Sequence, residues 1–287
     1  QRMTVVQHLI EKHTQTWYAN FAWRPSKLFD TVNRALTIFV GYRGKGVDNL
    51  TYSTNYQKWH SDTRGDLIPT ITCCEVDRER PAFWVPKLKA PLERSILSKM
   101  LASPTQVSSF IGKSNNFIYY RTTGGLYWKV FTDFAPSFKC DGKLGHSSRE
   151  TKFALAEAAY VRPIIAALSS DLFWWWYTVT SNLRDLNPSD IMGFPIPSSL
   201  LSDIEIAVLG DEYLSDLKRN STMLVRQQRQ TGKTETQMFE IKKSKPIIER
   251  IDNAMSHHYG LTMEELDYLM NYDIKYRIGA SSEDGDE

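Results

Sequence analysis

The apolar pattern at the start of the chain is that of strands preceded by one helix. Residues 3–14 carry apolar side chains at helical spacing, which predicts the helix. Runs rich in β-branched and aromatic residues, which favour strands, lie at 17–22, 34–42, 50–56 and 68–76. Residues 36–40 are apolar without alternation, a pattern typical of a strand buried on both faces of an α/β sheet. No complete β-α-β repeat is present, so we expect a partial sheet that exposes an apolar face or edge.

A β-hairpin is the clearest pattern in the middle of the chain. Residues 117–121 and 126–131 alternate in character, and Thr-Thr-Gly-Gly at 122–125 forms the turn between them. The cationic and aromatic side chains that alternation places on one side are Tyr119, Arg121, Tyr127 and Lys129. We expect a flexible loop at 139–149.

Helical spacing dominates the rest of the chain. The predicted helices lie at 88–101, at 154–168 with an interruption near Pro163, at 172–178, and over most of 201–228 with Gly210 as a weak point. Capping residues bound three shorter helices: Asn187 with Pro188 begins one that Gly193 ends, Ser244 begins one that Gly260 ends, and Thr262 with Glu265 begins a third. Strands and helices in separate blocks predict a mixed α+β fold.

Composition excludes several classes of protein. The 287 residues are 41% hydrophobic, too many for a disordered chain, and no apolar run reaches the ~18–20 residues of a membrane span. Three cysteines, of which Cys73 and Cys74 are adjacent, argue against a disulfide framework and for the reducing cytoplasm. The chain begins with Gln1 rather than Met, which favours a fragment of a longer protein.

Charge is unevenly distributed along the chain. The net charge of +2 hides a middle segment, 84–152, in which eleven Lys and Arg face four Asp and Glu, a net charge of +7. Residues 153–287 carry a net charge of −8. A basic segment beside a neutral scaffold is typical of a polyanion-binding site, although a solvated lysine-rich surface has the same pattern.

Several short motifs are weak matches to known sites. The glycines at 41–46 lack the order of a dinucleotide loop, and Thr231-Gly-Lys-Thr lacks the first glycine of a P-loop. Glu240 and Lys242 have no partnered Asp, as a nuclease would need, and His257 and His258 point about 100° apart on a helix. Trp174-Trp-Trp-Tyr is expected in the core.

The basic middle segment holds the candidate nucleic-acid contacts. Cations bind phosphates, aromatic rings stack on bases, and hydroxyls contact either. The candidates are Tyr119, Arg121, Thr122, Thr123, Tyr127, Lys129, Lys139, Lys143, His146, Ser147, Ser148 and Arg149, with Asn182 and Arg184 further along the chain. The alternative is a hairpin whose polar side is merely solvated.

Four stretches, at 24–40, 51–59, 168–197 and 251–277, together resemble a known family. Their order is similar to the C-terminal part of N6-adenine DNA methyltransferases of restriction-modification systems, especially the combined restriction-and-modification type. The resemblance implies that residues 1–83 are the last strands of a methyltransferase-like α/β domain and 84–200 a target recognition domain. It further implies a helical region at 201–279, and residues 280–287 are expected to form a disordered acidic tail.

The chain departs from this family at the catalytic centre. The Asn/Asp-Pro-Pro-Tyr/Phe tetrapeptide is absent, since Asn187-Pro-Ser-Asp does not match it, and so is the glycine-rich S-adenosylmethionine motif. No catalytic, cofactor or metal-binding residue is therefore assigned. The resemblance implies that S-adenosylmethionine binds to an N-terminal half or catalytic subunit outside this chain, and that the chain alone is inactive.

The function expected from the sequence is recognition of double-stranded DNA for an adenine methyltransferase. One alternative is a stand-alone specificity subunit that delivers another enzyme to DNA. Another is a cytoplasmic interaction protein whose basic patch binds an acidic protein. No membrane partner is expected.

Overall fold

The chain forms two compact units. The computed structural model describes residues 12–44, 50–77, 85–123, 128–228 and 232–278. The first unit contains residues 1–98 and 176–184, and the second contains 99–175 and 185–287. Two of the three divisions fall inside helices, α2 (Pro91–Leu101) and α4 (Asp171–Thr180), and the third lies between residues 184 and 185. The helix expected at 3–14 lies almost wholly outside the described residues, and so does the tail expected at 280–287.

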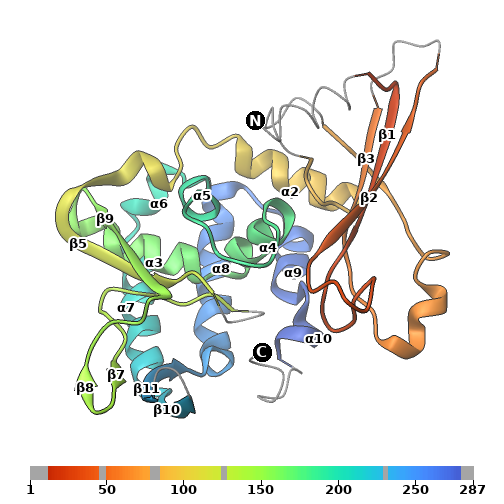
Figure 1. Cartoon of the computed structure of the whole chain (residues 1–287). Coiled ribbons are helices and arrows are strands. Elements are labelled where there is room, and N and C mark those ends of the chain that lie inside the picture. The colour runs from red at the N-terminus through yellow and green to blue at the C-terminus, as the bar shows by residue number, and fades with distance from the viewer. Residues whose placement is uncertain (1–11, 45–49, 78–84, 124–127, 229–231, 279–287) are drawn as a thin grey trace. The chain divides into compact units, whose positions relative to one another are not determined.

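The first unit is built on a four-stranded sheet with the order β2-β1-β3-β4 (Figure 1). Its strands are β1 (Gln15–Phe21), β2 (Leu36–Tyr42), β3 (Leu50–Gln57) and β4 (Cys74–Val76). β1 runs parallel to β3 and antiparallel to β2, and β4 is antiparallel to β3. Three of the predicted strands are thus confirmed, whereas only the end of the run at 68–76 is a strand. Residues 61–66 form a 3-10 helix, η1 (Ser61–Asp66).

The prediction that residues 36–40 are buried on both faces is wrong. β2 is the edge strand, and the side chains of Ile38, Phe39, Val40 and Tyr42 are 43%, 42%, 56% and 58% exposed. The core of the sheet lies instead at Phe21, which packs with Trp59 and Leu67 from the connections that follow β3. The expectation that this sheet exposes an apolar edge is confirmed.

The second unit contains a three-stranded sheet with the order β6-β5-β9. Its strands are β5 (Ile111–Arg121), β6 (Phe131–Thr132) and β9 (Glu150–Leu155). β5 and β6 do pair as a hairpin, but Tyr120 lies opposite Phe131, so the connection runs from 122 to 130 and is not a four-residue turn. Trp128 is drawn away from β5 because its indole N–H donates to the Arg277 carbonyl at 3.2 Å. β9 pairs along the other side of β5.

A four-stranded antiparallel sheet with the order β10-β11-β7-β8 completes the strands of this unit (Figure 1). Its members are β7 (Phe138–Cys140), β8 (Lys143–Leu144), β10 (Ser221–Gln228) and β11 (Gly232–Phe239). Two predictions are wrong here: 221–228 is a strand rather than helix, and 139–149 contains a hairpin rather than only a loop. Asp141 and Gly142 both have positive φ, as a tight hairpin turn requires. The two ends of the β10–β11 hairpin lie side by side, because the Glu240 N–H donates to the Asn220 carbonyl at 3.1 Å.

Helices make up the body of the second unit. They are η2 (Val107–Phe110), η3 (Ala158–Tyr160), α3 (Val161–Ser169), α5 (Pro188–Met192), α6 (Ser198–Leu201), α7 (Ile204–Arg219), η4 (Ile241–Ser244), α8 (Lys245–Tyr259), α9 (Met263–Asn271) and α10 (Ile274–Arg277). The capping residues at Asn187, Gly193, Gly260 and Thr262 are confirmed. Ser244 stands at the start of α8, but its hydroxyl donates to Asp216 instead of capping.

Two predicted weak points of helices have other roles. Pro163 lies in the first turn of α3, where a missing N–H costs no helical hydrogen bond, so it does not interrupt the helix. Gly210 lies inside α7 against α3, where an added Cβ would be 2.5 Å from the Arg162 carbonyl oxygen. Gly210 therefore permits the two helices to approach closely.

A buried charged cluster joins three helices, α4, α8 and α10. Asp171 at the start of α4 is fully buried and forms ion pairs with Arg277 of α10 and with Lys245 of α8, the latter at 2.7 Å. Asp252 of α8 accepts hydrogen bonds from the backbone N–H groups of Asp171 and Leu172. Burial and the adjacent Asp171 carboxylate raise the pKa of Asp252 well above its ordinary value. The cluster thus balances its charges with cations from two sequence-distant helices.

The aromatic run at 174–177 is buried, as predicted. Among the helices of the described ranges, none is both long and apolar enough to cross a membrane.

Candidate nucleic-acid interface

Three arginines from separate segments meet at the end of β5. Arg121 is the last residue of β5, Arg149 precedes β9, and Arg226 lies on β10. Burial, and then the neighbouring Arg149 and Arg226, lower the pKa of the Arg121 guanidinium, which Glu150 partly offsets. Like charges held this close repel one another, and an anion bound between them would relieve the repulsion. We name Arg121, Arg149 and Arg226 the arginine cluster.

Local backbone structure fixes the first two arginines of this cluster. Arg121 lies opposite Glu150 in the β5–β9 ladder, and the N–H and hydroxyl of Thr122 both donate to the Arg149 carbonyl, at 2.9 and 3.2 Å. Ser147 lies in a turn just before Arg149, and the Arg149 N–H donates to the Ser147 hydroxyl at 3.4 Å. Arg121 and Arg149 are therefore held by adjacent chain segments rather than by flexible termini.

Arg121 also faces the four-stranded sheet. Its Nη1 lies 3.7 Å from the sulfur of Met238 on β11. Within the described ranges, neither its Nε nor the buried Thr123 hydroxyl has a hydrogen-bond partner. Both atoms are buried, so neither is exposed to a ligand at this surface.

The exposed side of β5 and β9 combines aromatic rings with a cation. Lys152 Nζ lies 3.6 Å from the ring centre of Phe117 and 5.4 Å from that of Tyr119. Tyr119 and Arg121 share this side, and Ile118 and Tyr120 are buried on the other, so the predicted alternation is confirmed along β5. A ring engaged by a lysine presents less of its face to a base, so this side offers chiefly its positive charge.

The β7–β8 hairpin supplies the predicted lysines. Lys143 is exposed, whereas Lys139 lies 4.0 Å from Glu235, which is also paired with Lys233 at 3.0 Å. The Asp141 carboxylate accepts the Lys233 N–H at 2.8 Å, which fastens this hairpin to β11. His146 and Ser148 are exposed nearby in sequence. Burial raises the pKa of Glu150, and His146 and Arg121 partly offset this shift.

Among the other predicted contacts, Lys129 does not join this surface, and three more are not among the described residues of the second unit. Lys129 is half-buried, and burial lowers its pKa to about 8 although Asp185 and Asp190 lie close to it. Its side chain therefore belongs with the interior of the unit. Asn182 and Arg184 are exposed in the first unit, where the Asn182 side chain accepts the Arg184 N–H at 3.0 Å. Tyr127 lies outside the described residues.

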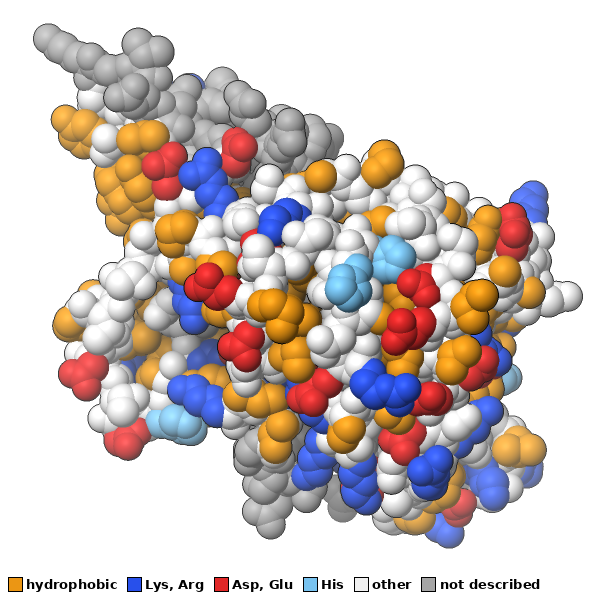
Figure 2. All heavy atoms as spheres, turned by 180° about the vertical axis from the view of Figure 1, so that it is seen from behind, with side chains coloured by type: hydrophobic (Ala, Val, Ile, Leu, Met, Phe, Trp, Pro, Cys, Tyr) orange, Lys and Arg blue, Asp and Glu red, His pale blue; other side chains and the backbone are white. Residues whose placement is uncertain are grey.

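Sequence reasoning missed the cations that follow α7. Residues 218–250 contain nine Lys and Arg and three Asp and Glu, but averaging over 153–287 hid them in a net negative charge. The pairing of β7 with β11 brings this second basic run beside the first. Counting the charges over a shorter stretch of sequence would have found this second basic run. Figure 2 shows Lys and Arg gathered at lower right, over the end of the second unit where Figure 1 places β10 and β11.

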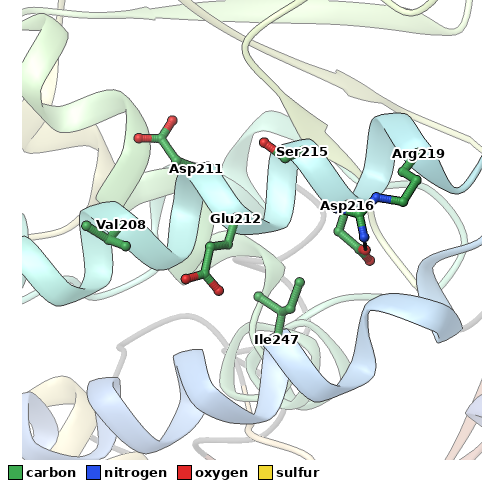
Figure 3. Close-up of a pocket in the computed structure, with 7 residues that line it drawn as sticks. All are labelled: Val208, Asp211, Glu212, Ser215, Asp216, Arg219 and Ile247. Atoms are coloured by element: carbon green, nitrogen blue, oxygen red, sulfur yellow. Dashed lines mark ion pairs between the residues drawn. The ribbon is translucent and has the colours of Figure 1, made fainter.

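A pocket beside α7 is less suited to a function. It has a volume of about 380 Å³ and lies between α7 and Ile247 of α8 (Figure 3). Its carboxylates are already paired: Asp216 with Arg219 at 3.5 Å, Glu212 with Arg250, and Asp211 with Arg162. No set of three metal-ligating side chains is grouped anywhere in the part of the chain that the structure describes.

One polar triplet has the residue types of a hydrolase. His258 lies 3.0 Å from the Ser199 hydroxyl through Nδ1 and 2.8 Å from Asp203 through Nε2. Asp203 also caps α7 by accepting the N–H groups of Glu205 and Ile206, and its pKa is lowered mainly by the His258 hydrogen bond. The nitrogens are reversed relative to a catalytic triad, so the triplet fastens α6, α7 and α8 to one another.

Comparisons with protein families, with curated proteins and with solved structures found no match to this chain.

Proposed function

We propose that this chain binds double-stranded DNA and provides the sequence recognition of an adenine-specific DNA methyltransferase. The observation that carries the proposal is the arginine cluster, in which the positive charges of Arg149 and Arg226 act on the half-buried Arg121 and lower its pKa. The surrounding residues Lys143, His146, Ser148 and Lys152 are exposed, so a duplex backbone could reach them. The resemblance to restriction-modification enzymes supports the assignment of the polyanion as DNA.

The partner in this proposal is a catalytic methyltransferase domain that binds S-adenosylmethionine. The exposed apolar edge of β2 supports such a partner, because an edge strand that carries no charged residue can pair with a strand of another domain. The three cysteines are unbridged, which fits a cytoplasmic protein.

Titration of a fluorescent duplex with the full chain tests DNA binding. We expect affinity to fall steeply between about 50 and 200 mM salt, because phosphate contacts release counterions. Arg149→Ala and Lys143→Ala should each weaken all sequences alike and reduce the salt slope by about one. Arg121→Ala should likewise weaken all sequences, because Arg121 belongs to the same cluster.

Lys113→Ala is the matched control, since Lys113 is exposed on β5 at the end of the strand away from Arg121. Equal weakening by the control and by Arg149→Ala would place the DNA elsewhere. Binding without salt dependence would favour the alternative partner, an acidic protein, which can be tested with a polyglutamate competitor.

The edge of β2 carries a second prediction. Without its partner domain, the purified chain should self-associate in a concentration-dependent way in sedimentation experiments. Val40→Lys places a charge on the edge and should shift the chain toward monomer. The control Val208→Lys alters a valine on α7 that is similarly exposed, 50% against 56% for Val40, and should leave association unchanged. A wild-type chain that stays monomeric at high concentration would contradict this prediction.

A further inference from the structure

The β10–β11 hairpin is a long, regular ribbon with its own exposed face. Its register runs without a break from Ser221 opposite Phe239 to Gln228 opposite Gly232. β11 also pairs with β7, whereas β10 is the outer strand in the order of this sheet. β10 is therefore an edge strand of a four-stranded sheet, and strands of a sheet can read bases in the major groove of DNA, which is about 12 Å wide.

Alternation divides the hairpin into two faces. One face carries Arg226 of the arginine cluster and Met238, which contacts Arg121. We name the opposite face the outer face; its members are Met223, Val225 and Gln227 on β10, Lys233, Glu235 and Gln237 on β11, and Lys139 on β7. The cations of the arginine cluster and the outer face therefore lie on opposite sides of one thin strand pair.

The outer face has the chemistry of base recognition. Met223 and Val225 are 44% and 53% exposed in the middle of a polar strand, and apolar side chains in such positions contact thymine methyl groups. Gln227 is exposed beside them, and a glutamine amide can pair with both N6 and N7 of adenine.

The charges of this face are compatible with a polyanion. Glu235 would repel phosphates alone, but it is paired with both Lys139 and Lys233. Gln237 is committed to the fold, because it accepts the Ser137 N–H and donates to the Ser221 hydroxyl, each at 3.0 Å. The groups left to contact DNA are thus those of β10 and the two lysines.

We infer that the outer face of the β10–β11 hairpin enters the major groove of duplex DNA and determines which bases are preferred, while the arginine cluster holds the phosphates. This inference rests on the proposed function, which it deepens by naming the specificity element. Val225 and Gln227 are its central residues.

Selection from a random duplex library, followed by sequencing, tests the division of roles. We expect the wild-type chain to enrich a defined DNA site. Gln227→Ala and Val225→Ala should each reduce the preference for the correct base at one or two positions by about 5- to 150-fold. Their affinity for unselected DNA should change less than about twofold. Arg149→Ala should instead weaken every sequence and keep the preference.

Thr222→Ala is the matched control, because Thr222 is exposed on the same strand but on the opposite face. If wild-type binds no duplex, the proposed function itself fails. If wild-type binds and Arg149→Ala weakens it, but both outer-face variants select the wild-type site, the function stands and this inference is overturned. This inference is also overturned if Val225→Ala abolishes self-association but selects the same DNA site as wild-type. The outer face would then be a contact between proteins.

Discussion

Replacing Arg277 with alanine is expected to destabilise the protein by about 3–5 kcal/mol, because it leaves Asp171 as a buried carboxylate without its closest cation. Arg277 is 3% exposed, and its guanidinium lies 3.9 Å from the ring centre of Trp128 and 5.5 Å from that of Trp174. Lys245 would still reach Asp171, but it also serves Glu249 and the Met270 carbonyl. Urea unfolding measures the loss.

Two further variants separate charge from packing in this cluster. Lys275→Ala removes an exposed cation from the same short helix and should change stability by less than about 0.5 kcal/mol. The double variant Arg277→Met with Asp171→Asn removes both charges and should recover part of the lost stability. If Arg277→Ala unfolds at the wild-type urea concentration, the ion pair does not contribute as described.

Gly210→Ala is expected to destabilise the protein although alanine is the better helix former. Helix propensity alone would favour alanine by about 1 kcal/mol. The added Cβ would meet the Arg162 carbonyl oxygen at 2.5 Å, a backbone atom that cannot rotate away, and such overpacking costs about 1–3 kcal/mol. The steric cost exceeds the propensity gain, so thermal unfolding should occur at a lower temperature, and Gly210→Val should lower it further.

Ser215→Ala provides the comparison for this pair of variants. Ser215 is exposed on the same helix, so alanine there changes propensity without a clash, and a small gain in stability is expected. Stabilisation by Gly210→Ala as well would mean that α3 and α7 can separate at little cost.

Local signals in the sequence predicted local structure well. Asn187 with Pro188, and Thr262 with Glu265, act through neighbouring backbone groups, so the residues that form each cap are adjacent in sequence. The Asp141-Gly142 turn had an equally local signal, the dipeptide typical of a tight hairpin, and was overlooked. β10 was assigned to helix because 201–228 was treated as one segment, although Asn220 ends α7.

Features that depend on distant partners were not predictable. The burial of β2 was inferred from its apolar side chains, but burial depends on neighbours that a strand pattern does not identify. Asp171 and Arg277 are 106 positions apart, and neither has a spacing that indicates the other. The predicted site contains Arg121 and Arg149 but not Arg226, because the pairing of β11 with β7 joins segments from either side of the helical body.

The closed base of the β10–β11 hairpin has a consequence for how such a protein could change over time. Asn220 and Glu240 are hydrogen-bonded to each other. The segment between them therefore leaves the helical body and returns to it at the same place. Residues 221–239 could be lengthened, shortened or exchanged for another hairpin while α7 and α8 kept their contact. Under the proposed function, new target preferences would then arise by replacing one short insert, with the scaffold and the arginines on β5 and before β9 left as they are.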